Sequence, residues 1–453
     1  MASTYLSRTP SSAGNRKTWT FSAWIKRSKL SIVGSTILFA ANSSAGSNDE
    51  DAIAIEEANN PRFLLNNGNG SSIKPSRLLR DTSAWYHIVV AVDTTQATAS
   101  NRVKYYFNGE LETSFSQENY PSQNYDCKIN NNVPHGIGFI NDTAGGGNSA
   151  YFDGSMSHVH FIDGTAYDAS AFGEYDANGV WTINTSPSVT YGTNGFFVLK
   201  DGNSVTDQSG NGNNWTVSGG TLTNTEDNPS NVFATINPLD RAINGTAPTF
   251  AYGNTQWTAS GNSTSNNAVR GTLGNSNGKY YFEAKLLEAS NTMIGVHLTS
   301  VSPFYDGDGY MGSNSGFYAI YINGTDTIYA IVGGSNQNVS LGSVTNNDII
   351  GCAFDFDNNK FYFSKNGTWL NSGDPTSGAT GTGSFGTLAS GLYVPGITNV
   401  SWTTASSTAF NFGNGYFGTT AVASAGTNAS GNGIFEYDVP TGYTALSTKG
   451  LNL

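Results

Sequence analysis

Apolar and polar residues alternate in residues 348–370, DIIGCAFDFDNNKFYFSKNGTWL. The apolar positions at every second residue are Ile350, Cys352, Phe354 and Phe356. This period is typical of a half-buried β-strand. The polar run at 357–359 favours a tight turn, the aromatic run at 360–364 predicts a returning strand, and Asn-Gly at 366–367 predicts a second turn. The stretch is therefore predicted to form a β-meander.

The same alternation recurs in the first third of the chain. Strands are predicted at residues 18–26 and 85–93, a hairpin with an Asn-Gly turn at 102–112, and a further strand at 152–162. Their spacing is that of a β-sandwich. The sequence shows neither a heptad run nor a fixed repeat of roughly 20–50 residues.

Composition supports an all-β fold. Of the 453 residues, 37% are hydrophobic and 12% are charged, whereas globular domains carry about 25% charged residues. Gly (54 residues), Asn, Ser and Thr replace the charges, which favours many strands joined by frequent turns. The 8 Trp, 23 Tyr and 25 Phe supply enough core material to argue against low-complexity disorder.

Charge and hydropathy argue against several kinds of partner. The net charge is −12 and no basic patch stands out, so we expect no nucleic acid partner. No apolar run approaches the roughly 20 residues of a membrane span, and the N-terminus lacks the apolar core of a secretory signal. We expect a protein that is made in a cytoplasm and has no membrane partner; if it works outside the cell, it leaves by another route, such as lysis. Cys127 and Cys352 are expected to be buried free thiols.

Four motifs follow one another in the C-terminal half: GKYYFEA at 278–284, IGV at 294–296, the meander at 348–370 and FNFG at 410–413. Together they resemble the SPRY domain. The resemblance implies a concanavalin-like β-sandwich used for recognition, and it brings no catalytic residues to carry over.

The N-terminal region carries TFSAWIKR at 20–27, WYHIVVAVD at 85–93, VKYYFNGEL at 103–111 and FDGSMSHVHFIDGTAYDASAFGE at 152–174. These segments resemble the laminin-G-like, concanavalin A-like lectin/glucanase jelly roll. Glucanase members of that superfamily need an acidic cluster such as ExDxxE on one strand, and no such cluster is found here.

Residues 194–201 and 207–216 resemble the opening of a laminin-G-like domain, although they follow that domain instead of preceding it. Either they supply a permuted first strand to the N-terminal sandwich, or they form a small bridge. We therefore predict an all-β chain of two concanavalin-like antiparallel β-sandwich (jelly-roll) domains joined by a strand-bearing bridge. The predicted boundaries are 1–175 for the laminin-G-like sandwich, 176–235 for the bridge and 236–453 for the SPRY-like sandwich.

The five histidines are His87, His135, His158, His160 and His297. Only His158 and His160 are spaced like metal ligands, and on a strand both would point to one face. Without a third ligand nearby we interpret this pair as a polar surface ladder and predict no metal site. No nucleophile elbow, HExxH motif or P-loop is present.

Two acidic runs, at 49–51 and 306–308, lie in loops rich in Gly, Ser and Asn. Both could bind Ca²⁺, which takes oxygen ligands in flexible geometry, but we favour solvated loop tips. A glycosidase needs two carboxylates about 5–10 Å apart, and nothing in the sequence selects such a pair. We expect no catalytic residues and no cofactor, with Ca²⁺ as the one candidate ion.

Aromatic residues in loops suggest a binding site instead. Flat rings beside carboxylates suit saccharides, which offer apolar CH faces and hydroxyl groups. The candidate ligand-binding residues are Tyr305, Asp306, Asp308, Tyr310 and Trp369. The alternative is that these rings plug the ends of the sandwich core.

The two-domain arrangement, SGNGNNWT at 209–216 and the ending EYDVPTGYTALSTKGLNL resemble surface proteins of marine tailed phages. This resemblance implies a non-enzymatic virion surface protein: a fibre, adhesin or capsid appendage that binds host or environmental glycans weakly. We expect other virion proteins as partners and a homo-oligomer, with a trimer favoured. The alternatives are a glycan-cleaving enzyme of the concanavalin A-like glucanase type and a purely architectural capsid decoration.

Overall fold

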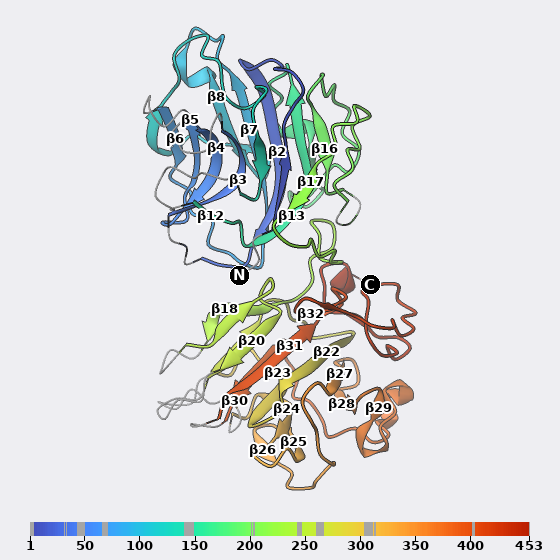
Figure 1. The fold of residues 1–453 in the computed structure, drawn as a ribbon. Coiled ribbons are helices and arrows are strands. Elements are labelled where there is room, and N and C mark those ends of the chain that lie inside the picture. Colours follow the sequence, from blue (N-terminus) through green and yellow to red (C-terminus); the bar gives the residue numbers. More distant parts are fainter. Residues whose placement is uncertain are drawn as a thin grey trace. The chain divides into compact units, whose positions relative to one another are not determined.

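The chain forms two compact units, Met1–Asn224 and Thr225–Leu453 (Figure 1). The computed structural model describes residues 4–30, 32, 34–42, 50–65, 71–139, 149–200, 202, 204–241, 247–259, 267–302, 311, 314–400 and 404–452. Within these residues the helices are short 3-10 turns: Ala99–Asn101, Ala169–Ala171, Leu370–Ser372, Pro375–Thr380 and Gly450–Asn452. None of them is long or apolar enough to cross a membrane.

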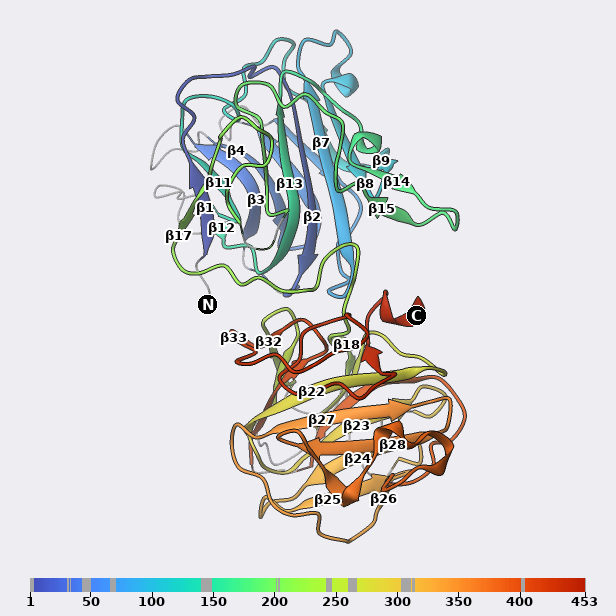
Figure 2. The same ribbon diagram turned by 90° about the vertical axis from the view of Figure 1, so that its right-hand side faces the viewer.

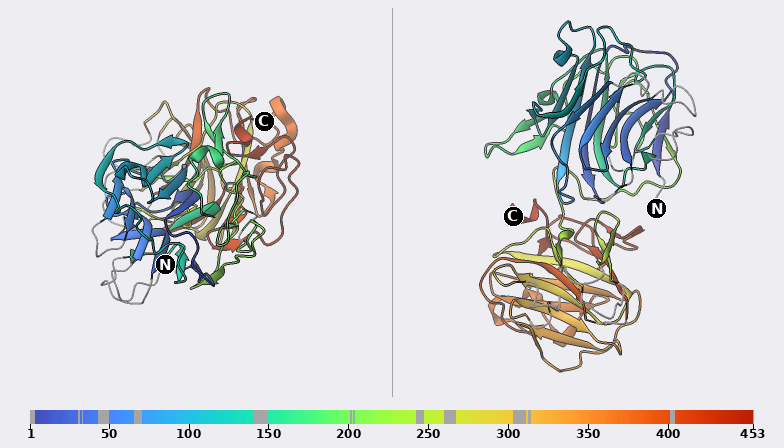
Figure 3. Two further views of the ribbon diagram at one scale, coloured as in Figure 1. Left: turned by 90° about the horizontal axis from the view of Figure 1, so that it is seen from above. Right: turned by 90° about the vertical axis from the view of Figure 1, so that its left-hand side faces the viewer.

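The N-terminal unit contains two main sheets. The larger sheet has the order β10 (Phe115–Asn119), β6 (Ser71–Pro75), β5 (Pro61–Leu65), β4 (Glu50–Glu56), β3 (Ser35–Asn42), β11 (His135–Ile137), β1 (Tyr5–Arg8) and β17 (Thr216–Ser218), with β12 (Ser149–Ala150) parallel to β3. The smaller sheet has the order β16 (Phe196–Val198), β13 (Gly154–Asp163), β2 (Thr18–Arg27), β7 (Trp85–Asp93), β8 (Val103–Phe107) and β9 (Glu110–Leu111). Figure 3 shows the blue strands of the larger sheet side by side in its right-hand view.

The two sheets enclose one hydrophobic core. Phe21 on β2 and Phe39 on β3 stack with ring centroids 5.0 Å apart, which joins the smaller sheet to the larger one. Along β2, Trp19, Phe21 and Ile25 all belong to this core, because alternate side chains of a strand point to the same face. The period-2 pattern in residues 18–26 therefore predicted the strand and the face that enters this core, although the opposite face of β2 is buried as well.

The segment after residue 175 contributes strands to both sheets. β16 pairs with β13, with Phe196 opposite Phe161, and β17 pairs with β1 at the edge of the larger sheet. Phe196 and Trp215 from this segment lie in the core. Of the two alternatives for residues 194–216, the structure has the strands that complete the N-terminal sandwich.

A hairpin of β14 (Gly173–Tyr175) and β15 (Trp181–Ile183) projects beside β8 and β9 (Figure 2). It covers His87, whose ring stacks on Trp24 at 4.9 Å and on Trp181 at 5.8 Å. The Trp181 indole N–H donates to His87 Nδ1 at 3.0 Å, so His87 Nε2 carries the proton and faces Ser22 Oγ at 2.9 Å. Burial lowers the pKa of His87 to about 3, so the imidazole is neutral.

The C-terminal unit also has two main sheets. The seven-stranded sheet has the order β18 (Ile236–Arg241), β21 (Ala268–Gly271), β30 (Tyr393–Asn399), β23 (Thr292–Leu298), β24 (Phe317–Ile322), β25 (Ile328–Val332) and β26 (Ser335–Asn336). The eight-stranded sheet has the order β19 (Thr249–Ala251), β20 (Gln256–Ala259), β31 (Ser406–Asn411), β22 (Lys279–Glu288), β27 (Ile349–Asp355), β28 (Lys360–Lys365) and β29 (Thr368–Trp369), with β34 (Thr444–Ala445) parallel to β22. Tyr318 of β24 packs on Phe361 of β28 at 5.6 Å, which joins the two sheets.

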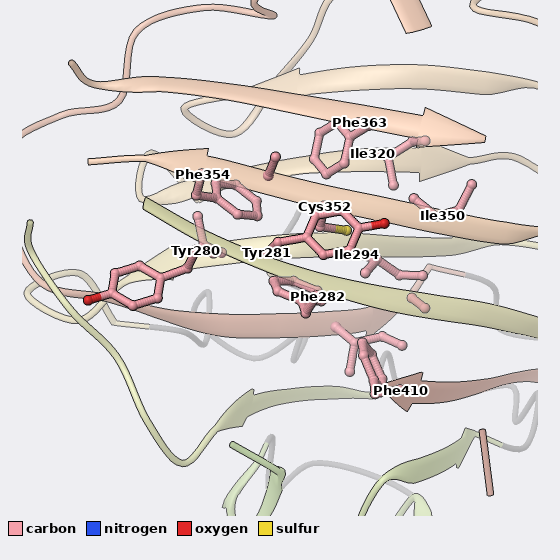
Figure 4. Close-up of a cluster of buried hydrophobic side chains, with 14 of the residues drawn as sticks. Tyr280, Tyr281, Phe282, Ile294, Ile320, Ile350, Cys352, Phe354, Phe363 and Phe410 are labelled. Atoms are coloured by element: carbon pink, nitrogen blue, oxygen red, sulfur yellow. The ribbon is translucent and has the colours of Figure 1, made fainter. Parts of the chain in front are cut away.

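The predicted meander is present as β27, β28 and β29, which pair in sequence order. Its aromatic residues lie in the main core of this unit with Cys352, as Figure 4 shows for Phe354 and Phe363. Cys352 and Cys127 are free and buried, in the cores of different units. The all-β fold class of two antiparallel sandwiches is confirmed.

The segment after β31 packs on the eight-stranded sheet through contacts with β22. Phe435 contacts the ring of Tyr281 on β22 at 5.1 Å. The carboxylate of Glu283, on the same strand, accepts the backbone N–H groups of Glu436 and Tyr437, each at 2.9 Å. One buried side chain thus ties the C-terminal segment to the sheet.

Candidate functional site

Four of the five candidate ligand-binding residues, Tyr305, Asp306, Asp308 and Tyr310, lie outside the described residues. The described residues on either side attach this loop to the seven-stranded sheet. Met311 is buried in a small apolar cluster with Phe317 of β24. The Asn314 amide donates to the Ser302 carbonyl and accepts the Gly316 N–H at 3.0 Å. The described residues that flank positions 303–310 are therefore fixed beside the start of β24.

Trp369, the fifth candidate, lies on β29 at the edge of the eight-stranded sheet. Its ring is partly buried against the main core and meets the ring of Tyr281 edge-on at 6.4 Å. The ring is thus part of the core boundary, and a contact between Trp369 and a ligand stays a prediction.

The acidic run at 49–51 is not a solvated loop tip. Asp49 lies outside the described residues, but Glu50 and Asp51 are on β4 and buried. The Asp51 carboxylate accepts the backbone N–H of Lys128 and, at 3.4 Å, that of Ile129. The loop expectation was wrong because the strand begins at Glu50 and turns Asp51 inward. The second run, at 306–308, lies outside the described residues.

His158 and His160 also differ from the expected surface ladder, because both are buried. The pairing of β13 with β2 is interrupted between Ser157 and His160, and His158 has φ +50°, so a bulge lies at this point. His160 Nδ1 lies 2.9 Å from the Tyr191 hydroxyl, and burial holds the pKa of His160 well below its usual value. Residues 191–197 cover the pair, which the sequence pattern did not indicate. Within the described ranges, no three His, Cys, Asp or Glu side chains form a metal-sized group.

Among the described carboxylates of the C-terminal unit, Glu283 is the most enclosed, with 0% of its surface exposed. Besides the two backbone N–H groups, it accepts the Tyr281 hydroxyl and the Asn411 amide, each at 3.2 Å. Burial raises the pKa of Glu283 to about 7, against the opposite effect of these hydrogen bonds. All four partners are donors, so both carboxylate oxygens are occupied by structural hydrogen bonds.

A cavity inside the N-terminal unit is too small for a saccharide. Its volume is about 10 Å³, which corresponds to roughly one water molecule. The residues that line it include Arg8, Phe39, His135 and Trp215. A saccharide would therefore not fit into this cavity.

Three aromatic rings meet on the surface of the N-terminal unit: Tyr5, Phe139 and Tyr151. Phe139 and Tyr151 stack with centroids 4.0 Å apart and planes 19° apart. Tyr5 meets Phe139 edge-on at 5.3 Å and lies 6.1 Å from Tyr151. All three side chains are partly exposed, and none belongs to the core of the sandwich. We call these three residues the aromatic platform.

The neighbours of these rings explain why they face outward. Leu6, which follows Tyr5 on β1, lies in the core, so Tyr5 points to the opposite face of the larger sheet. Phe152, which follows Tyr151, packs against the core. The backbone N–H of Phe152 donates to the Gly138 carbonyl at 2.8 Å, which places Tyr151 beside Phe139.

The backbone conformation of Gly138 determines where the third ring, Phe139, points. Ile137 at the end of β11 faces the core, and in a regular strand Phe139 would point the same way. Gly138 instead has φ +83°, a conformation that glycine adopts readily, and the chain turns so that Phe139 lies against Tyr5. Sequence reasoning missed the platform because its rings come from three separate segments, and each stands next to a residue with a stronger core signal.

Comparison with known families agrees with the fold of each unit. Residues 2–170 match the model of the "Concanavalin A-like lectin/glucanases superfamily", and residues 279–385 match that of the "SPRY domain". None of the curated proteins matches the chain.

Three solved structures resemble parts of the chain. The SPRY domain of human HERC1 is 15% identical, with 39% of this chain and 96% of that chain covered and a TM-score of 0.30. The PSpry domain of TRIM65 is 12% identical, with 39% of this chain and 91% of that chain covered and a TM-score of 0.29. A native heptameric SAP-like pentraxin from Limulus polyphemus is 18% identical, with 37% of this chain and 72% of that chain covered and a TM-score of 0.28.

The strand pairings and the two family matches agree: the N-terminal unit contains a concanavalin A-like β-sandwich, and the C-terminal unit contains a region similar to the SPRY domain.

Proposed function

We propose that this chain is a non-enzymatic surface protein of a tailed-phage virion, with two sandwich modules that bind host or environmental glycans weakly. The observation that carries the proposal is that one chain combines a region matching the concanavalin A-like lectin/glucanases superfamily with a region matching the SPRY domain. Its composition, poor in charge and rich in Gly, Asn, Ser and Thr, suits neutral polar polymers. The proposed location is the virion surface, with other virion proteins as partners.

Two buried acids support binding over hydrolysis. Glu283 and Asp51 both accept backbone N–H groups, so each already has a structural role. A glycosidase needs a pair of carboxylates free to act on a substrate, about 5–10 Å apart. We therefore propose no catalytic residues and no bound cofactor, with Ca²⁺ as the only ion to be tested.

Weak sites become useful when several act together. A millimolar Kd corresponds to only about −4 kcal/mol, whereas linked copies raise the overall affinity without any new contact. We therefore propose that the chain works as a homo-oligomer, with a trimer as the favoured assembly. Tyr305, Asp306, Asp308 and Tyr310 are the proposed contacts on the C-terminal unit.

Two experiments test this function. Immunogold labelling of intact phage particles should place the protein on the particle surface, and labelling only after disruption would contradict that location.

A glycan array probed with multimerised full-length protein should show binding that falls in the double change Tyr305→Ala and Tyr310→Ala. Tyr252→Ala is the matched control, because Tyr252 is 49% exposed on the same unit. If the multimer binds no glycan, the architectural alternative replaces the adhesin.

A further inference from the structure

We propose that the aromatic platform of Tyr5, Phe139 and Tyr151 is a second saccharide-binding site, specific for uncharged pyranose chains. The inference rests on the proposed glycan-binding function and deepens it by naming a site on the N-terminal unit. It requires no metal and no charged group.

The three rings of the platform are not enclosed in the core of the sandwich. Aromatic side chains contribute most when they are enclosed, and the neighbours Leu6, Ile137 and Phe152 all face or contact the core. The platform rings are instead partly exposed and pack on one another. A contiguous group of exposed apolar side chains is a feature of binding surfaces, whereas single exposed residues are ordinary.

Hydroxyl groups lie on the same sheet face as Tyr5. Paired residues of antiparallel strands lie on the same face, and Tyr5 is opposite Ser218 while Ser7 is opposite Thr216. The Ser7 and Ser218 hydroxyls lie 2.9 Å apart. Flat rings beside a row of hydroxyl groups match a pyranose ring, which has an apolar CH face and hydroxyl groups at its rim.

This face of β1 and β17 is uncharged. The side chains that share this face with Tyr5 on β1 and β17 are Ser7, Thr216 and Ser218, and all are uncharged. A cationic ligand would lack an opposite charge among these residues, and an anionic ligand would lack one as well. The site therefore favours neutral hexose polymers over uronic or sialic acids.

The site also gives residues 194–218 a role in binding. β17 comes from the segment that follows the laminin-G-like region in sequence, yet it forms the edge of the larger sheet next to β1. The hydroxyl row therefore exists only because this segment returns to complete the sandwich.

The test uses multimerised full-length protein and a panel of cello-, malto-, manno- and chito-hexaose immobilised at equal density. We expect binding to at least one of them, about tenfold weaker in Tyr5→Ala with Tyr151→Ala, which corresponds to about 1.4 kcal/mol. Tyr5→Phe with Tyr151→Phe keeps the rings and should retain most of the affinity. Tyr151→Leu keeps apolar bulk but removes the flat face, so binding should fall even though the fold is retained.

Tyr175→Ala is the matched control, because Tyr175 is a 50% exposed tyrosine on the hairpin of the same unit. Thermal unfolding of each variant checks that the fold persists. Undiminished binding in the double alanine variant overturns the platform but leaves the glycan-binding function standing. Equal loss in the alanine and phenylalanine variants would assign the effect to the hydroxyls and overturn the stacking site. A lack of binding to every oligosaccharide by the unaltered protein overturns both, and self-association that is lost in the alanine variant would identify a protein interface instead.

Discussion

Replacing Glu283 with glutamine is expected to change how the stability of the C-terminal unit depends on pH. Burial raises the pKa of this carboxyl group from 4.5 to about 7. At 1.36 kcal/mol for each tenfold change in proton affinity, this rise corresponds to about 3 kcal/mol. Because the folded state binds the proton more tightly than the unfolded state, the contribution of Glu283 to the free energy of unfolding is greatest below about pH 4.5. It declines as the pH rises to about 7.

The amide should remove this pH dependence and introduce a constant cost. One of the two oxygens becomes an NH₂ group that faces a donor, so a backbone N–H, that of Glu436 or Tyr437, loses its acceptor. An unpaired buried donor costs about 1–3 kcal/mol. The wild type should therefore be more stable than Glu283→Gln near pH 5, and this difference should shrink by about 3 kcal/mol by pH 8.

The stability of the variant must be subtracted from that of the wild type at each pH, because His297 in the same unit changes stability with pH in the opposite direction. Burial lowers the pKa of His297 to about 4, so its contribution to stability increases as the pH rises from about 4 to 6.5. The wild type and Glu283→Gln share this contribution of His297, so it cancels in the difference between their free energies of unfolding. Glu288→Gln, a change at the exposed end of the same strand, is the matched control and should leave the pH profile of the wild type intact.

Cysteine labelling offers an assay for each unit. Cys352 lies in the core of the C-terminal unit and Cys127 in that of the N-terminal unit. A brief pulse of a thiol reagent at increasing urea, followed by peptide mass spectrometry, therefore reports unfolding of each unit separately. A wild-type-minus-variant difference that is constant from pH 5 to 8, or that grows with pH, would refute the reasoning about Glu283.

Three further predictions concern the N-terminal unit and the cysteines. Trp181→Ala should destabilise this unit by about 2–4 kcal/mol, because His87 loses a stacked ring and the hydrogen bond from the indole; Cys127 labelling at lower urea would show this, and an unchanged midpoint would contradict it. A chain that ends at residue 190 lacks β16 and β17 and should fail to fold cooperatively, whereas one that ends at residue 224 should fold; circular dichroism melts compare the two. Thiol titration of denatured, non-reduced protein should count two free cysteines, and a count of zero in a monomer would contradict their separation into different cores.

Local pattern determined much of the fold. The alternation in residues 348–370 and 18–26 predicted strands that are present as β27, β28 and β2, because the period of side chains along a strand is a property of neighbouring residues. The turn residues at 357–359 and 366–367 likewise predicted where the meander reverses. Motifs in order along the chain were enough to indicate both domain families.

Only the tertiary structure decided where side chains lie when their partners are distant in sequence. It buried Asp51, placed His160 under a later segment and brought Trp369 to the edge of the core. It paired β17 with β1 and brought the rings of the aromatic platform into contact. The physical reason is that exposure and ligand geometry depend on which strands pair and which segments cover them. Those contacts between distant residues leave no periodic signal in the sequence itself.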